Sequence, residues 1–230
     1  MAETSSNSPA TPPPSPTAVG PALPTYEQQM SQDLGWAMTQ GSLFFEGGGK
    51  VQETLQRITK KLDELSVPYA IVGGMALFAH GFRRYTEDVD ILVTPDGLRR
   101  IHDELEGRGY IPPFANSKHL RDTETKVKIE FLTTGGYPGD GKPKPVAFPD
   151  PADVVETHRG IKCIRLTTLV ELKLASGMTS PHRLKDLSDV QEVTRMLRLP
   201  REFGEQLNPY VRSKFDELWV PPTPEHTDVH

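Results

Sequence analysis

Two aspartates stand at alternate positions at the start of an apolar segment, DVDILV, which spans residues 88–93. Side chains of a strand alternate between its two faces, so Asp88 and Asp90 are expected on the same face. Two carboxylates on one face of a half-buried strand repel each other, and each is costly to bury alone. A divalent cation removes this conflict, and oxygen ligands at this spacing suit Mg²⁺ or Mn²⁺.

A third acid fits the same arrangement. In the segment KVKIEFL, residues 126–132, Glu130 lies between Ile129 and Phe131 and faces the opposite way from both. If this strand lies beside residues 88–93, Glu130 joins the aspartate pair. Three carboxylates can hold two metal ions about 3.5–4 Å apart, an arrangement that polarises attacking and leaving oxygens in phosphoryl chemistry.

A glycine pair precedes the aspartates. Gly73 and Gly74 follow a short apolar run and lead into a helix-like segment. Such a turn lets the backbone approach a phosphate closely, and a helix N-terminus presents free N–H groups to an anion. With Arg84 and Thr86 nearby, the pattern predicts a nucleoside triphosphate held beside a metal. Taken alone, an acid–x–acid pair more often lies on a solvated strand edge, and a glycine pair is a weaker signal still.

The remaining pattern predicts further helices and strands around these motifs. Apolar residues from Val51 to Leu65 recur at steps of four and three, which is typical of one buried helix face. Thr168 and Glu171 stand at capping-box spacing before a helix that ends at Gly177. Strands are expected at 69–72, 88–93, 126–132 and 161–166. Helices are expected at 75–80, at 95–105 and from Ser180-Pro181 to about Leu197, the last with Leu184 on its inward face. Residues 133–145 are expected to form a mobile loop.

Domain organisation follows from composition. The first 24 residues contain seven prolines among Ser, Thr and Ala, too little apolar material to offset the entropy of ordering. Lys50 of the GGGK run is followed by Val51, where a phosphate loop needs Ser or Thr, so a linker is preferred there. The expected divisions are a disordered tail at 1–25, a linker or packing segment at 26–50, a core at 51–166, a helical part at 167–220 and a second disordered tail at 221–230.

Composition limits the classes of function. A net charge of −5 argues against a surface that generally coats nucleic acid, and no apolar run approaches the roughly 20 residues that span a bilayer. The N-terminus lacks a secretory pattern, and a single cysteine, Cys163, cannot form an internal disulfide. A cytoplasmic protein without membrane partners is expected. The histidines show no metal-ligand spacing with cysteine, so no zinc site is expected.

Together these residues carry a family resemblance. Val72-Gly73-Gly74, then Asp88-Val89-Asp90, then Ile129-Glu130 resemble the signature of the DNA polymerase β–like nucleotidyltransferase superfamily. The finer pattern GGMAL…RYTEDVD is similar to the branch of AbiEii-type toxins and minimal nucleotidyltransferases, which includes type IV toxin–antitoxin systems. The resemblance covers roughly residues 51–198.

The resemblance implies an α+β fold, a mixed β-sheet flanked by helices with further C-terminal helices. It implies transfer of a nucleoside monophosphate from an NTP to an RNA such as tRNA, a protein or a small molecule. Asp88, Asp90 and Glu130 would be the catalytic and metal-binding residues, with Mg²⁺ or Mn²⁺ as cofactor, and Glu130 would help to deprotonate the acceptor. A cognate antitoxin or toxin would be a partner. A non-catalytic nucleotide sensor or partner-binding module with the same fold is the alternative.

Downstream, KLASGMTSPHRLKDLSDV resembles the lysine helix of that branch and the R-x-K-D-x-x-D helix that follows it. Lys173 would reach the triphosphate. Arg183, Lys185, Asp186 and Asp189 lie on neighbouring turns of the next helix and form either part of the site or an ion-pair network. Gly74 stands where many relatives have Ser, which weakens inference about the acceptor. The expected nucleotide-binding residues are Gly73, Gly74, Arg84, Thr86, Lys173, Arg183 and Asp186.

Several short basic clusters have two interpretations. Either they line a groove for RNA, or they are solvated faces, the commoner role of such clusters. The aromatic residues do not interleave with them in a stacking pattern. They are Arg83-Arg84, Arg99-Arg100, Lys118–Arg121, Lys126, Lys128, Lys142 and Lys144.

Overall fold

The computed structural model describes residues 23–115 and 117–221. Both predicted tails, 1–25 and 221–230, fall almost entirely outside these residues.

A seven-stranded mixed sheet forms the centre of the described chain, with the strand order β3-β4-β5-β2-β1-β7-β6. β2 pairs parallel with β5 and antiparallel with β1, and β1 pairs parallel with β7. This confirms the predicted α+β class with a mixed sheet. The strands are β1 (Tyr69–Ile71), β2 (Asp88–Val93), β3 (Tyr110–Ile111), β4 (His119–Asp122), β5 (Lys128–Thr133), β6 (Val155–His158) and β7 (Ile161–Ile164).

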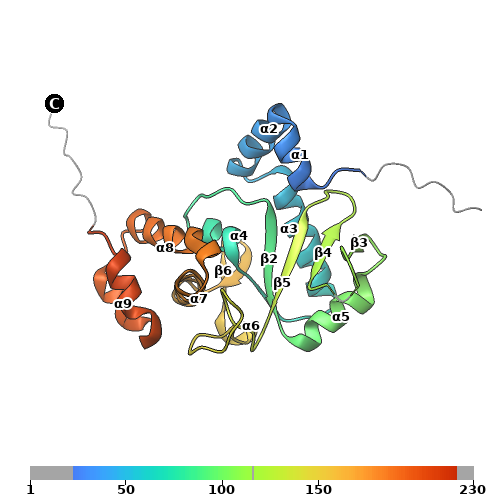
Figure 1. The fold of residues 1–230 in the computed structure, drawn as a ribbon. Helices are drawn as coiled ribbons and strands as arrows, with labels where there is room; N and C mark the ends of the chain where they lie inside the picture. Colours follow the sequence, from blue (N-terminus) through green and yellow to red (C-terminus); the bar gives the residue numbers. More distant parts are fainter. Residues whose placement is uncertain (1–22, 116, 222–230) are drawn as a thin grey trace, which may run out of the picture.

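Helices flank the sheet. Figure 1 shows α7, α8 and α9 gathered toward one end of the sheet, and α5 with β3 at the other. Among the described residues, every helix is too short or too polar to cross a bilayer. The helices are α1 (Tyr26–Gln32), α2 (Leu34–Phe45), α3 (Gly49–Glu64), α4 (Gly73–Ala79), α5 (Pro95–Leu105), α6 (Pro151–Val154), α7 (Leu166–Thr179), α8 (Leu184–Met196) and α9 (Pro209–Leu218), with 3₁₀ turns η1 (Pro181–Arg183) and η2 (Arg201–Gln206).

One face of α3 and the apolar residues of β2 contribute to the core. Leu55, Ile58 and Leu62 of α3 are at most 2% exposed, as the periodicity predicts, and α3 packs on β2. Burying each such side chain contributes roughly 1.5–3 kcal/mol. In β2, Val89 and Ile91 are fully buried, while Asp88 and Asp90, which alternate with them, are only partly buried. The predicted strand at 88–93 is therefore confirmed, with its acids turned away from the core.

Residues 26–45 form two helices that the sequence pattern did not indicate. Tyr26 is buried in α1, and its hydroxyl lies 2.5 Å from the hydroxyl of Tyr85. Phe44 of α2 is also buried and makes edge-to-face contacts with Phe78 and Tyr85. These aromatic contacts attach α1 and α2 to the segment that leads into β2, and α2 also to α4.

Two predictions about the C-terminal helices are wrong. The first concerns the capping box. α7 begins at Leu166, so Thr168 lies inside the helix and does not cap it. Glu171, its expected partner, instead accepts a hydrogen bond at 2.5 Å from the backbone N–H of the distant Asn208. Leu184, expected inward, is 65% exposed. The 3₁₀ turn η1 precedes α8 and delays its start, so Leu184 falls in the first turn and faces solvent.

The segment between β5 and α6 contains no helix or strand, as the loop prediction requires. It is nevertheless fastened to the rest of the chain. Lys144 Nζ donates to Pro138 O at 2.6 Å and to Thr179 Oγ1 at 3.2 Å, and Val146 is buried. These contacts place the loop along α7.

Candidate active site

The parallel pairing of β2 with β5 brings the three predicted acids together. In its register Asp90 lies opposite Glu130, and Asp88 lies opposite Lys128. Paired residues project from the same face of a sheet, so all four side chains share one face. One carboxylate oxygen from each of Asp88, Asp90 and Glu130 lies within 4.8 Å of the others. The sequence placed these acids on one face, and the fold makes them adjacent.

A cavity of about 360 Å³ opens over these acids. Every residue that is expected to catalyse or to bind metal or nucleotide lines this cavity. α7 and the start of α8 form its other wall. The assigned residues in the lining are Gly73, Gly74, Arg84, Thr86, Asp88, Asp90, Glu130, Lys173, Arg183 and Asp186. Lys185 of the same helix also lines the cavity, as do Lys128, Ser176 and His182, which were not assigned to the site.

The glycine pair is required by side chains that lie directly against it. Gly73 has a φ of +60°, and a Cβ there would lie 1.9 Å from Asp90 Oδ2. A Cβ on Gly74 would lie 2.7 Å from the Cβ of Thr86. Thr86 Oγ1 in turn donates to Asp88 Oδ1 at 2.8 Å. The two glycines therefore allow the aspartates and Thr86 to pack against the start of α4.

Replacing Gly73 by Ala should destabilise the protein by about 1–3 kcal/mol, through left-handed backbone strain and displacement of Asp90. Gly107→Ala is the matched control, because its φ is +74° but nothing lies within 4 Å of its Cβ position. Urea unfolding of both variants should show the larger loss at Gly73. Equal losses would mean that the Asp90 contact contributes nothing.

Lys128 lies between the acids and was missed as a site residue. Its Nζ is 3.4 Å from Asp88 Oδ2 and 3.1 Å from Glu130 Oε2. Burial opposes its charge, but Asp88 and Glu130 outweigh burial and raise the pKa of Lys128. The signal was present in the sequence, because Lys128 stands two positions before Glu130 on the same strand and must share its face.

The three carboxylates of this group outnumber the one ammonium that contacts them directly, that of Lys128. Burial, followed by the charges of Asp88 and Glu130, raises the pKa of Asp90 to about 7. A cluster of oxygen donors that carries surplus negative charge matches the ligands that Mg²⁺ and Mn²⁺ prefer. The residues present therefore fit the predicted metal.

Without divalent cations, ionisation of Asp90 should lower the free energy of unfolding as pH rises. Folded Asp90 holds its proton to about pH 7, whereas unfolded Asp releases it near pH 3.9, so stability falls between these values. Because Asp90 opens on a solvated cavity, we expect a loss of about 1–2 kcal/mol. In urea unfolding with EDTA at pH 8, the free energy of unfolding of Asp90→Asn should exceed that of wild type by this amount. At pH 5 the difference should be smaller. A gap that does not depend on pH would contradict the assignment.

On the opposite wall, Lys173 joins an ion-pair network. Its Nζ lies 2.8 Å from Asp186 Oδ1 and 2.8 Å from Asp189 Oδ2, and Ser176 Oγ donates to Asp186 at 2.7 Å. Arg84 Nε lies 2.9 Å from Asp189 Oδ1. Burial disfavours the charge of Asp186, but Lys173 and these hydrogen bonds outweigh it and lower the Asp186 pKa. The network links α7, α8 and the segment before β2, and its two cations are balanced by two acids.

Other basic residues make local ion pairs far apart in the fold. Arg121 on β4 pairs with Glu27 of α1 at 2.9 Å, and Arg99 on α5 pairs with Asp96 at 2.6 Å. Lys144 pairs with Asp140 at 2.5 Å. These three cations are each neutralised by a carboxylate, at separate places in the fold, so they do not form one continuous basic groove. At the mouth of the cavity, Arg183 and Lys185 are exposed.

Searches of known proteins give distant structural likenesses only. No protein-family model matches the chain, and no curated protein matches it in sequence. ANT(2″)-Ia, solved with adenylyl-2″-tobramycin, is 13% identical over 72% of this chain and 96% of its own, with a TM-score of 0.48. JHP933 from Helicobacter pylori is 18% identical over 67% and 70%, with a TM-score of 0.39.

A third similar structure is an antigenic nucleotidyltransferase-like protein from Paracoccidioides brasiliensis. It is 17% identical and covers 63% of this chain and 75% of its own, with a TM-score of 0.40. At identities below 20% and TM-scores below 0.5, none of these likenesses assigns an activity to this chain.

Proposed function

We propose that the protein is a nucleotidyltransferase that depends on Mg²⁺ or Mn²⁺. The observation that carries the proposal is the register of β2 and β5, which sets Asp88, Asp90 and Glu130 around one point of a cavity. Such a carboxylate group is costly to maintain unless a cation compensates it. A divalent cation bound there would polarise the α-phosphate of an NTP and stabilise the charge that develops on it.

The residues of the chain then have distinct roles. Asp88 and Asp90 hold the cation, and Glu130 accepts the proton of the acceptor hydroxyl as its oxygen attacks the α-phosphorus. The bond from that phosphorus to the bridging oxygen of the β-phosphate breaks, and pyrophosphate leaves. The start of α4 at Gly73 and Gly74, with exposed Arg183 and Lys185 across the cavity, binds the triphosphate.

Thr86 and the Lys173 network complete this proposal. Thr86 fixes Asp88 through its hydrogen bond. Lys173, Arg84 and Asp186 hold α7 and α8 beside the acids and so keep the opposite wall of the cavity in place. The class of acceptor stays open among an RNA end such as tRNA, a protein side chain and a small molecule. A role in a toxin–antitoxin pair, with its cognate partner, also stays a prediction.

Incubating the protein with α-labelled NTPs and cell extract tests the proposal. We expect label to move onto an acceptor in Mg²⁺ and not in EDTA, with release of pyrophosphate. Mass analysis of the labelled material would identify the acceptor. No transfer with any of the four NTPs, in Mg²⁺ or in Mn²⁺, would contradict the proposal.

The position of Lys128 favours a second candidate, a non-catalytic nucleotide-binding module. Its ammonium already compensates Asp88 and Glu130 in part, so the acids can persist without a metal. This candidate predicts tight NTP binding in EDTA and no turnover in Mg²⁺. Calorimetry in both buffers separates the two functions, since the enzyme requires the divalent cation for productive binding.

A further inference from the structure

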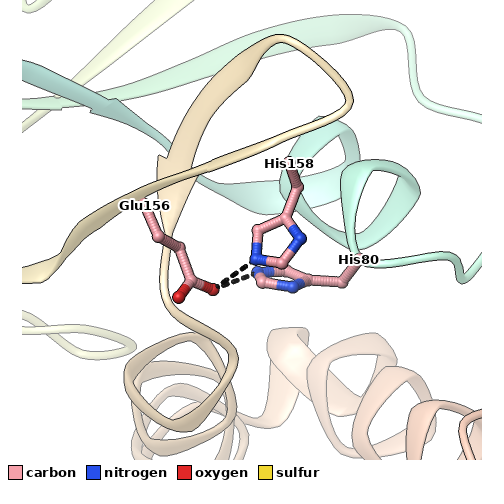
Figure 2. A group of neighbouring side chains, drawn as sticks. All are labelled: His80, Glu156 and His158. Atoms are coloured by element: carbon pink, nitrogen blue, oxygen red, sulfur yellow. Dashed lines mark hydrogen bonds and ion pairs between the residues drawn. The ribbon is translucent and has the colours of Figure 1, made fainter.

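Two histidines and a glutamate converge away from the carboxylates of β2 and β5. His80 ends α4, whereas Glu156 and His158 stand two positions apart on β6 and share one face. Figure 2 shows their side chains pointing at one another from the helix and the strand. His80 lies 76 residues before Glu156 in the sequence, so no ligand spacing was visible there, and the absence of a zinc site was the expectation.

The donor atoms are close enough to share one ion. Glu156 Oε1 lies 2.8 Å from His158 Nε2 and 3.8 Å from His80 Nε2. The two imidazole centroids are 4.7 Å apart, and one donor atom from each residue lies within 4.8 Å of the others. Tetrahedral zinc with ligand bonds near 2.0–2.2 Å separates its ligands by about 3.3 Å. The two distances from Glu156 bracket that value, and each differs from it by about half an ångström.

The chemistry of the donors selects the metal. Imidazole nitrogens with one carboxylate suit Zn²⁺ and similar transition metals, whereas Mg²⁺ requires oxygen ligands. Cys163 stands opposite Glu156 in the β6–β7 register, and its Sγ lies 3.9 Å from His80 Nε2. A thiol adjacent to the three donors adds to the preference for zinc. The chain would then carry two cation sites that prefer different metals.

We infer that His80, Glu156 and His158 form a zinc site that fastens the β6–β7 hairpin to the C-terminal end of α4. His80 Nε2 lies 2.8 Å from Ile164 O and donates to it, so zinc takes the place of this hydrogen bond while the imidazole proton moves to Nδ1. His80 is 4% exposed, but Glu156 and His158 are about 40% exposed, which leaves an entry path. α4 starts against Asp90, so the zinc holds the far end of a helix that borders the cavity.

Calorimetric titration of the metal-stripped full chain with Zn²⁺, in excess Mg²⁺, tests the inference. We expect one zinc per chain. Replacing a neighbour of a ligand typically weakens binding 10–100-fold, so loss of a ligand in His158→Gln should weaken it at least about 100-fold. His158 is 42% exposed, so the variant should fold, which circular dichroism verifies, and Glu156→Gln provides a second test.

Two controls separate this site from others. His102→Gln alters another histidine–glutamate pair, in which His102 Nδ1 lies 3.2 Å from Glu106 Oε2, and should leave zinc binding unchanged. Asp90→Asn alters the acidic site and should also leave zinc binding unchanged, whatever its effect on nucleotidyl transfer. The inference is overturned if no one-to-one binding is seen, if His158→Gln binds zinc as wild type does, or if Asp90→Asn abolishes binding.

Discussion

Asp90→Asn is expected to lower nucleotidyl transfer about 10³-fold or more, while the protein remains folded. A bound divalent cation contributes several kcal/mol of transition-state stabilisation, and each 1.4 kcal/mol is a factor of ten in rate. Asp90 is the central acid, because it lies beside Asp88 on its own strand and opposite Glu130 on the next. The same variant should be more stable than wild type in EDTA at pH 8, since a carboxylate that is unfavourable without metal has been removed.

The rate of label transfer, measured at saturating Mg²⁺, decides this prediction. Asp96→Asn is the matched control, because Asp96 forms an exposed ion pair with Arg99 on α5 and is not in the cavity lining. It should retain wild-type activity. A rate for Asp90→Asn within tenfold of wild type would remove Asp90 from the proposed metal site.

Lys173→Met is expected to destabilise the protein by about 3–5 kcal/mol, because it removes one partner from a buried ion-pair group. Lys173 is 7% exposed, and its Nζ contacts both Asp186 and Asp189. Without it, Asp189 still pairs with Arg84 and Asp186 still accepts the hydrogen bond of Ser176, but the ammonium that the two carboxylates share is gone. Urea unfolding at pH 7 measures the loss. If Lys173 instead serves the triphosphate alone, stability should be nearly unchanged and only the KM for NTP should rise.

Lys162→Met controls for the loss of a lysine. Lys162 pairs with Asp63 at 2.7 Å, but both side chains are about half exposed, so this variant should lose less than about 1 kcal/mol of unfolding free energy.

The pH dependence of the Lys173→Met effect gives a second check. The lowered pKa of Asp186 in wild type means that its stabilising effect is lost as pH falls through that value. Without Lys173 the pKa of Asp186 rises, so Asp186 is easier to protonate and the stability deficit of the variant should shrink toward low pH.

Period-two alternation predicted the acidic site well. It placed Asp88 and Asp90 on one face, and the same rule applied to residues 126–132 put Glu130 away from the core. Strand pairing is a long-range property, however, and alternation alone did not specify that β2 and β5 run parallel with Asp90 opposite Glu130. The roles assigned to these acids in catalysis and metal binding remain predictions.

Other features depend on contacts that local patterns do not encode. Glu171 has capping-box spacing from Thr168, yet it binds the backbone of Asn208, and a tertiary contact outweighs the local preference. A 3₁₀ turn precedes α8, so the α-helix begins only at Leu184 and the side chain of this residue is exposed. The group of His80 with Glu156 and His158 could not be found by spacing, because α4 and β6 become neighbours only through the sheet.

The most direct test of the central claim is a crystal grown with Mn²⁺ and a non-hydrolysable NTP, measured for anomalous scattering from manganese. We expect an anomalous peak among the carboxylate oxygens of Asp88, Asp90 and Glu130, with the α-phosphate bound to the same ion. Oxygen distances should be about 2.0–2.3 Å, near those of Mg²⁺. A nucleotide bound elsewhere, or a cavity in which Lys128 still pairs with Asp88 and Glu130 and no manganese is present, would contradict the claim.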